Sequence, residues 1–408
     1  MKRHRTVFLI GLALLALWWT PQGWTEGTAP WVPIVVNEQW GYIDHAGTIV
    51  VEPQFDYAWN FSEGLAVVTI GATCGYIDQT GKSAIGFQFD SCESFAEGLA
   101  VIGVRIGGMH YGYIDKTGTV VIKPQFGDAQ PFSEGLAYVK ESLYRPKFDE
   151  TVPFSEALAA VKASRAADMI VPREGYIDKT GELMIELQPD SGGFDSSDFS
   201  EGLALISIDE KFSYIDRTGK IVIEPQFEVA GKFSEGLAAV GNTTFGGLYA
   251  SAKIGYIDKT GQFVIEPRFG MLSELSDFSE GLALACYGPS EGQCGYIDQH
   301  GTFVIKPQFY SALPFSDGLA PVFVGDRETG KWGYIDETGK FLIEPQFDWY
   351  AIHHTYGSEY TGKFEEGLAK INLGEQRREE ERNIQRWGYI DKTGRVVWAG
   401  EQIWRFTR

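Results

Sequence analysis

One short segment of this chain matches a nucleophile motif, but its surroundings do not fit an enzyme. Residues 288–292, Gly-Pro-Ser-Glu-Gly, have the Gly-x-Ser-x-Gly spacing, which works when a sharp turn between a strand and a helix exposes the serine. Here Cys286 and Cys294 bracket the segment, and another extended stretch follows where a helix is needed. We interpret Ser290 as part of a hairpin tip and expect no catalytic residue and no enzymatic activity.

Carboxylates are the most regularly repeated reactive groups. Asp-x-Thr-Gly, as at residues 115–118, has one residue more than the Asp-Thr-Gly of aspartic proteases, and its repetition indicates a turn capped by Asp. A second acidic position lies in a repeated Phe-Ser-Glu-Gly phrase. Calcium could bridge units if both sets lined one face, but we favour turn and corner roles and expect no metal or cofactor. The second set is Glu63, Glu97, Glu134, Glu156, Glu201, Glu235, Glu280, Asp317 and Glu366.

The four cysteines are candidates for disulfides. They are Cys74, Cys92, Cys286 and Cys294. Local pairing, Cys74 with Cys92 and Cys286 with Cys294, is the simplest of the three connectivities because each pair spans only one or two hairpins. Paired Cys-x-x-Cys motifs, which zinc or redox sites favour, do not occur.

Aromatic residues could form a surface for sugars. Tyr57, Trp59, Trp349 and Tyr350 lie at corresponding places after two Pro-Gln-Phe phrases and are candidates for glycan stacking. They could equally wedge adjacent units apart. Most of the chain's 11 Trp, 19 Tyr and 27 Phe recur with the repeated phrases, so we expect these aromatics to form the core.

Three repeated phrases must position all these groups. Gly/Ser-Tyr-Ile-Asp occurs nine times and alternates with Phe-Ser-Glu-Gly-Leu-Ala and Val-Ile-Glu/Lys-Pro-Gln-Phe. The alternating residues and the Asp-x-x-Gly turn predict a β-hairpin, Leu-Ala-x-Val predicts a third strand, and Pro should end the strand before it. Residues 146–161 duplicate part of a unit. Helical periodicity is absent from the array, apart from a possible helix at residues 375–385.

These units predict an all-β chain of tandem three-stranded antiparallel repeats. Each unit is too small to bury its own apolar face, so neighbours must stack. The repeats begin and end in the same phase, so no strand has to be exchanged between the ends. We therefore favour an open, solenoid-like array of about nine units plus the half-repeat, with a closed β-propeller-like ring as the alternative.

The N-terminal 27 residues differ from the rest. Lys2, Arg3 and Arg5 precede an apolar run at residues 7–19, which predicts a signal peptide that is cleaved or kept as an N-terminal anchor. Residues 28–408 form the array. With 35 Lys+Arg against 55 Asp+Glu and no basic stripe, nucleic acid is not an expected partner. We expect an exported monomer in the periplasm, the cell envelope or outside the cell.

The repeated phrases resemble the WG-repeat (KWG-type) family. The resemblance rests on residues 331–340, Lys-Trp-Gly-Tyr-Ile-Asp-Glu-Thr-Gly-Lys, with residues 344–347 and 315–320, and it covers about residues 32–400. Trp precedes Gly only at Trp40, Trp332 and Trp387, and the second and fourth repeats depart from the pattern in their second strand. The family implies a bacterial, often exported β-repeat protein without an established catalytic site.

Two functions remain open on the sequence. A repeat scaffold that binds a protein partner would use the loops in which the units differ, at residues 140–151, 243–253 and 351–363. A cell-wall or glycan-binding array would use the surplus aromatics. We favour the protein-interaction scaffold.

Overall fold

The computed structural model describes residues 31–149, 152–164, 167–169, 172–187, 197–244, 251–270, 276–286, 294–352, 362–378 and 382–403. Within these residues the protein is almost entirely β-structure, built from antiparallel sheets that follow one another along the chain. The fold class predicted from the sequence is confirmed. None of the described helices is long and apolar enough to cross a membrane.

Each Tyr-Ile-Asp phrase lies in a central strand of one unit, and the strands of a unit pair in chain order. The first unit has β1 (Val32–Val36), β2 (Gln39–Ile43) and β3 (Ile49–Phe55), and the second has β4 (Tyr57–Ser62), β5 (Leu65–Ile70), β6 (Thr73–Asp78) and β7 (Ser83–Phe89). The third has β8 (Ser91–Cys92), β9 (Leu99–Ile106), β10 (Gly108–Asp115) and β11 (Val120–Ala129). The fourth has β12 (Ala137–Glu141), β15 (Glu174–Ile177) and β16 (Leu183–Leu187), and between the first two of these an insertion with β13 (Tyr144–Pro146), α1 (Phe154–Ser164) and β14 (Ala167–Met169).

The remaining units repeat this arrangement. The fifth has β17 (Leu203–Ile208), β18 (Lys211–Asp216) and β19 (Ile221–Phe227), and the sixth has β20 (Val229–Ala230), β21 (Ala238–Thr244), β22 (Ser251–Ile257) and β23 (Phe263–Gly270). The seventh has β24 (Ala283–Cys286), β25 (Cys294–Ile297) and β26 (Phe303–Phe309), and the eighth has β27 (Ser311–Ala312), β28 (Ala320–Val324), β29 (Lys331–Ile335) and β30 (Phe341–Phe347). The short helix η1 (Trp349–Ala351) follows and opens the ninth unit. The ninth has β31 (Phe364–Glu365), β32 (Leu368–Arg378), β33 (Arg382–Asp391) and β34 (Val396–Ile403).

The glycine before each Tyr is required by a close approach of backbones. In the first unit Tyr42 pairs with Val51 but Trp40 pairs with Phe55, so β3 carries a two-residue bulge opposite Gly41. A Cβ on Gly41 would collide with the carbonyl oxygen of Val51. The expectation that Pro ends this strand is wrong, because the bulge takes Pro53 out of the hydrogen-bond ladder and the strand runs on to Phe55.

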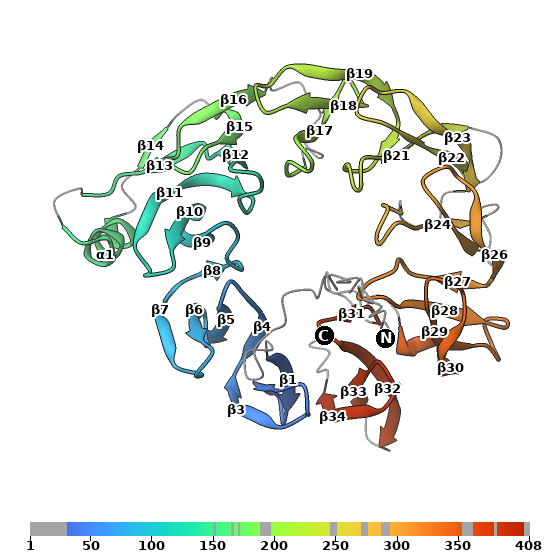
Figure 1. Ribbon diagram of the computed structural model, residues 1–408. Helices are drawn as coiled ribbons and strands as arrows, with labels where there is room; N and C mark the ends of the chain where they lie inside the picture. Colours follow the sequence, from blue (N-terminus) through green and yellow to red (C-terminus); the bar gives the residue numbers. More distant parts are fainter. Residues whose placement is uncertain are drawn as a thin grey trace, which may run out of the picture.

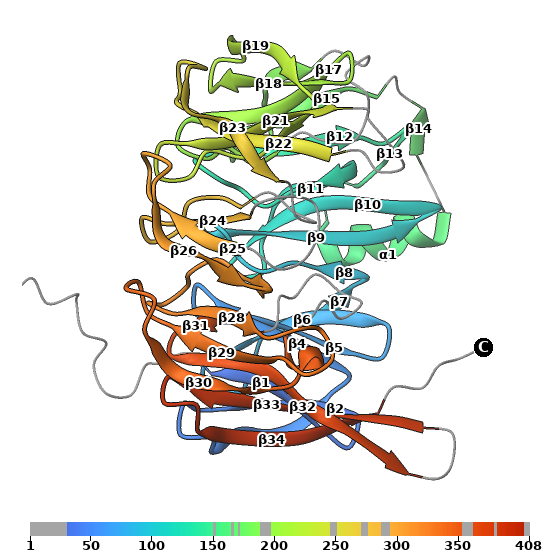
Figure 2. The ribbon, with the colours of Figure 1, turned by 90° about the vertical axis from the view of Figure 1, so that its right-hand side faces the viewer.

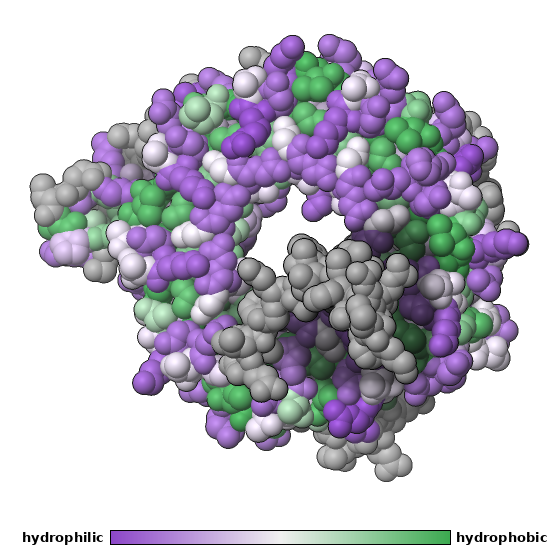
Figure 3. Space-filling model, in the orientation of Figure 1, coloured by the Kyte–Doolittle hydropathy of each residue, from purple (hydrophilic) through white to green (hydrophobic). Residues whose placement is uncertain are grey.

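The units follow a ring around a central opening (Figure 1), and the side view shows the first unit (blue) at the same end of the molecule as the last unit (red) (Figure 2). Hydrophilic residues line the upper and left rim of this opening in Figure 3. The first and last units are in contact: the Tyr389 hydroxyl donates to the carbonyl of Pro33 at 2.9 Å, and His45 Nε2 donates to the carbonyl of Glu366 at 2.6 Å. The open array that we favoured from the phase of the repeats is therefore corrected to the alternative, the closed ring. The ring closes without exchanging a strand, because whole sheets pack against each other at its ends.

Two segments differ in secondary structure from their expected form. Residues 146–161 resemble part of a unit, yet residues from Phe154 onward form α1. In the second unit's corner Glu63 and Gly64 both take positive φ, 51° and 88°. Ala157 replaces that glycine in the insertion, and alanine disfavours positive φ and favours a helix. Residues 375–385, expected as a possible helix, belong to β32 and β33 where the structure describes them.

The same contacts join each unit to the next. The buried Tyr of one unit packs its ring on the Phe that opens the next corner, as Tyr214 does on Phe233 with ring centroids 5.0 Å apart. Its hydroxyl donates to a backbone carbonyl of that next unit, here Gly231 at 2.7 Å. The corner serine also crosses the seam, since Ser200 Oγ donates to the Phe233 carbonyl at 2.7 Å. This seam thus combines apolar burial with satisfied polar groups.

The tyrosine hydroxyls offer a test of this seam. Tyr214→Phe removes the donor to Gly231 and leaves a carbonyl without its partner, so we expect a loss of about 1–2 kcal/mol in the free energy of unfolding. Tyr334→Phe is the matched control, because the Tyr334 hydroxyl is buried and has no hydrogen-bond partner among the described residues. Its removal should be neutral or slightly stabilising. Urea unfolding of both variants measures the difference, and equal losses would contradict the role given to the hydroxyl.

Candidate functional site

The side chains of the repeated aspartates accept hydrogen bonds within their own turns. Asp78 Oδ1 accepts the backbone N–H groups of Thr80 at 2.8 Å and Lys82 at 3.2 Å, and it also accepts the Thr80 hydroxyl at 2.6 Å. These bonds lower the pKa of Asp78, since they favour its charged form. The interpretation of Asp-x-Thr-Gly as a capped turn is confirmed.

The corner carboxylates join neighbouring units. Glu63 accepts the backbone N–H of Gly98 in the next corner at 3.0 Å and lies 3.0 Å from Lys116 Nζ, which also donates to the Glu63 carbonyl. Corresponding carboxylate bonds to the next corner's Gly N–H are made by Glu97, Glu134, Glu201, Glu235, Glu280 and Asp317. Among the described residues no three His, Cys, Asp or Glu side chains form a group that could hold a metal ion. The corner role is confirmed for these seven acids, whereas it is wrong for Glu156, which lies in the first turn of α1.

Two disulfides link the four cysteines. Cys74 in β6 is bonded to Cys92 in β8, which joins the second unit to the third. Cys286 is bonded to Cys294 across the paired strands β24 and β25. The Gly-x-Ser-x-Gly segment between the second pair lies outside the described residues, so its interpretation as a hairpin tip stays a prediction.

The position before the Gly-Tyr phrase pins one unit to the next. Trp40 packs on Tyr57 of the second unit with ring centroids 4.5 Å apart, and Trp332 Nε1 donates to the Trp349 carbonyl at 3.1 Å. Cys74 holds the same position and crosses its seam by a disulfide instead. Tryptophan and a disulfide therefore do the same structural work in different seams.

The aromatics proposed for glycan stacking lie in these seams. Tyr57 is 37% exposed and packs on Trp59 with centroids 4.3 Å apart, whereas Trp59 is partly buried. Trp349 packs on Phe323 at 4.7 Å and is also partly buried, and Tyr350 follows it in η1. The structure places the two pairs in different seams, and the exposed ring among the three described side chains is Tyr57.

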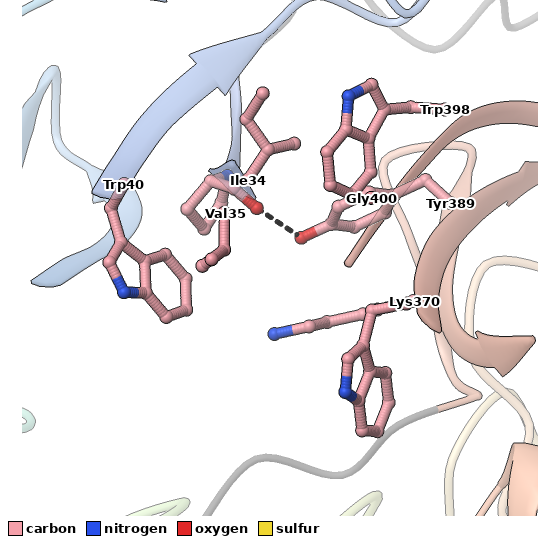
Figure 4. Close-up of a pocket in the computed structure, with 9 residues that line it drawn as sticks. Ile34, Val35, Trp40, Lys370, Tyr389, Trp398 and Gly400 are labelled. Carbon is pink, nitrogen blue, oxygen red and sulfur yellow. Dashed lines mark hydrogen bonds between the residues drawn. The ribbon is translucent and has the colours of Figure 1, made fainter. Parts of the chain in front are cut away.

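A narrow recess lies where the ring closes (Figure 4). Lys370 reaches from the last unit toward Trp40 of the first, with Nζ 5.5 Å from the ring of Trp40 and 5.7 Å from that of Trp387. The Trp387 indole nitrogen is buried without a hydrogen-bond partner among the described residues. Among the described residues that line the recess, Lys370 is the one that carries a charge, and we regard the recess as the joint that closes the ring.

The insertion in the fourth unit is the main departure from the repeat and lies on the outside of the ring (Figure 1). Leu158 of α1 is buried in a cluster with Ile106. Lys162 Nζ forms an ion pair with Asp90 Oδ2 at 2.7 Å, which fastens the helix to the residue after β7. Sequence analysis missed this helix because its start copies the corner phrase, and the alanine in place of glycine was the signal that could have revealed it.

The other variable loops are described only in part. Residues 140–151 contain β13, which pairs with β14 of the insertion. Residues 243–253 include the ends of the paired strands β21 and β22, with the tip outside the described residues. Most of residues 351–363 lies outside them as well. The insertion therefore carries the best described of the variable surfaces.

Comparison with known families identifies the repeat. The family description "WG containing repeat" matches residues 40–74, 75–108, 111–142, 175–212, 212–242, 254–288, 295–327 and 332–354. The chain belongs to this family. The matches cover more than half of the chain and follow the units of the WG-repeat ring. A comparison with curated proteins finds no match.

Solved structures resemble the WG-repeat ring in fold. One titled "Crystal structure of the eukaryotic initiation factor" has a TM-score of 0.57 at 12% identity and covers 92% of this chain and 97% of its own. Kluyveromyces lactis Hsv2p has a TM-score of 0.38 at 10% identity, covering 77% of this chain and 97% of its own. At these identities the first similarity concerns the fold alone, which is β-propeller-like.

The corner glutamates predict a pH dependence of opposite sign at two seams. Burial opposes ionisation of Glu63, but hydrogen bonds from Lys116 and Gly98 outweigh it and lower its pKa, so its stabilisation is present above pH 4.5 and is lost as the pH falls through the lowered pKa. Burial raises the pKa of Glu366, which His45 only partly offsets, so ionised Glu366 opposes folding at neutral pH and the penalty disappears as the pH falls through the raised pKa.

Glutamine variants measure these two contributions. Glu63→Gln should lower the free energy of unfolding at pH 7 by up to about 1 kcal/mol, because the pair is solvent-exposed. Glu366→Gln should leave it unchanged or raise it. Both effects should shrink toward pH 3 in urea unfolding. Destabilisation by Glu366→Gln at pH 7 would show that the charge of Glu366 supports the closing seam.

The disulfides predict a hierarchy of stability. Cys74→Ala with Cys92→Ala opens a loop with a sequence separation of 18, against 8 for the Cys286 and Cys294 pair. The chain-entropy relation gives losses of about 3 and about 2.5 kcal/mol. Hydrogen exchange should show faster exchange on both sides of the seam between the second and third units only in the first variant, because that bond joins two units. Exchange confined to one strand pair in both variants would contradict this.

Proposed function

We propose that this WG-repeat ring is a non-catalytic, exported scaffold that binds a protein partner through its insertions. The observation that carries the proposal is that the repeated carboxylates already form hydrogen bonds within the ring. The aspartates cap their own turns, and the corner carboxylates bind the next corner. Chemistry that recognises a partner then has to come from segments that differ between units, and such segments carry binding in repeat proteins.

The perturbed ionisable groups support a scaffold rather than an enzyme. Burial raises the pKa of the seam tyrosines, such as Tyr214, which follows from their packing. Burial also raises the pKa of Asp198 and Asp277, while Lys232 opposes both shifts. Asp198 and Asp277 come directly before corner Phe residues of two different units. The tyrosine shifts recur with the repeat, whereas the two aspartates share the Coulombic influence of Lys232 across neighbouring units.

Export is supported by two features. The N-terminal basic residues and the apolar run that follows fit a signal peptide or anchor. Two disulfides and no free cysteine among the described residues suit an oxidising compartment.

The face of α1 that points away from the ring is the surface to test. Ala159 and Ala160 are exposed there, while the neighbouring Leu158 is buried. Ala159→Arg combined with Ala160→Glu changes this surface at no net charge and keeps residues that tolerate a helix. A matched control, Val222→Arg with Val264→Glu, places the same charges on exposed positions of β19 and β23.

Affinity capture from an envelope extract with the full chain, at low and moderate salt, tests the proposal. We expect the wild type and the control to retain one discrete protein at both salt concentrations. The helix variant should retain at least tenfold less of this protein. Equal capture by all three proteins would show that the α1 face is not the docking surface. Recovery at low salt alone would indicate nonspecific attraction to the acidic chain and contradict a specific partner.

Glycan binding is the second candidate, and Tyr57 favours it. Its ring is partly exposed and held between Trp40 and Trp59, which suits stacking against a sugar. Sedimentation with wall polysaccharide that Tyr57→Ala abolishes would favour this function.

A further inference from the structure

A crevice of about 420 Å³ lies between the ring and the insertion of the fourth unit. Its ring side includes Gln88 from β7, Thr119 from the turn before β11, and Lys123 from β11. Its other side includes Asp149 and Phe154, next to and within α1. The volume is in the range of small-molecule sites in proteins.

The walls of this crevice are held in place by several contacts. Asp90 follows β7, accepts the backbone N–H of Arg105 at 2.8 Å and pairs with Lys162 of α1 at 2.7 Å. Phe154 packs on Phe148 with ring centroids 5.4 Å apart. The ring side and the helix side are thus fastened to each other, so the crevice is formed before any ligand arrives.

Comparison with another unit shows how the crevice is kept open. In the fifth unit the outward-facing row of the last strand carries Val222, Glu224 and Gln226. The corresponding row on β7 is Ala84, Gly86 and Gln88, and a Cβ on Gly86 would meet no atom within 4 Å. The second unit therefore lacks the branched side chain and the carboxylate that stand beside the corresponding glutamine in the fifth unit.

The chemistry of the lining selects one class of ligand. The carboxamide of Gln88 and the hydroxyl of Thr119 both donate and accept hydrogen bonds. Among the described residues of the lining, Lys123 and Asp149 carry opposite charges, so this part of the crevice has no net charge to attract a phosphate or a cation. Phe154 and the valines beside it give an apolar surface suited to the C–H face of a sugar ring. The geometry points to a binding site for a neutral saccharide in this crevice, which is independent of a protein partner on the outer face of α1.

The repeat supplies matched controls for a test by isothermal titration calorimetry. The full chain is titrated with chitotetraose and, separately, with cellotetraose. Gln88→Leu and Lys123→Gln alter the crevice, and Gln226→Leu and Lys306→Gln make the same changes at corresponding exposed positions of other units. We expect at least one of the two saccharides to bind the wild type and the controls, and each crevice variant to weaken this binding at least tenfold at an unchanged thermal midpoint.

Several outcomes would overturn the assignment. They are no heat of binding for either saccharide at millimolar concentration, equal weakening by the control variants, and tighter binding of inorganic phosphate than of the saccharides at the same crevice. Binding of chitotetraose alone would narrow the ligand to an acetamido sugar, and binding of both would indicate neutral saccharides in general. Partner capture by Gln88→Leu should equal that of the wild type, which separates this site from the proposed scaffold function.

Discussion

The whole ring depends on the inability of one unit to bury its own apolar face. Three or four short strands leave Tyr, Phe and Ile side chains exposed unless another unit covers them. Most seams solve this with one side chain: the Tyr ring packs on the next corner's Phe, and its hydroxyl donates to a backbone carbonyl there, as Tyr76 does on Phe95 and with the carbonyl of Glu93. A buried aromatic with a polar end can supply area and a hydrogen bond together, which explains why Tyr and not Phe stands at this position.

The ring closes through contacts between the last and first units that correspond to contacts between neighbouring units elsewhere. Because all units present similar faces, the last unit can meet the first without a new kind of contact. Gly47 of the first unit sits against the backbone of Val397 in the last, as Gly81 sits against the Val51 side chain within the array. His45 takes the place that Lys116 has in its own seam and reaches the carbonyl of a corner glutamate. Closure is thus a property of repeated surfaces, and a strand shared between the chain ends is not needed.

Sequence patterns predicted what is local and failed where distant or competing effects decide. The Asp78 turn and the Glu63 corner were predictable because their partners follow from spacing and donor chemistry. The bond of Tyr389 to Pro33 joins residues 356 positions apart, and the phase of the repeats contains no information about it. The helix of the insertion was hidden by similarity to a corner phrase, although one Gly-to-Ala difference, at Ala157, reverses the local preference. The sequence predicted that Pro53 ends its strand, because proline lacks a backbone N–H. The strand continues, because the pairs on both sides of the bulge outweigh the loss of that one donor.

The insertion shows why such a ring can acquire new surfaces at little structural cost. Strands β12 and β15 pair in register from Ala137 with Ile177 to Lys140 with Glu174, so the sheet of the fourth unit is complete despite the long segment between them. The seam residues of that unit are also present, because Tyr176 packs on Phe199 and donates to the carbonyl of Ser197. A segment that leaves and re-enters between two paired strands leaves the seam contacts of its own unit in place, and here its Leu158 adds to the cluster between the second and third units. The surface on the outer side of the ring can therefore change in this segment while the paired strands and the seam of the fourth unit stay the same.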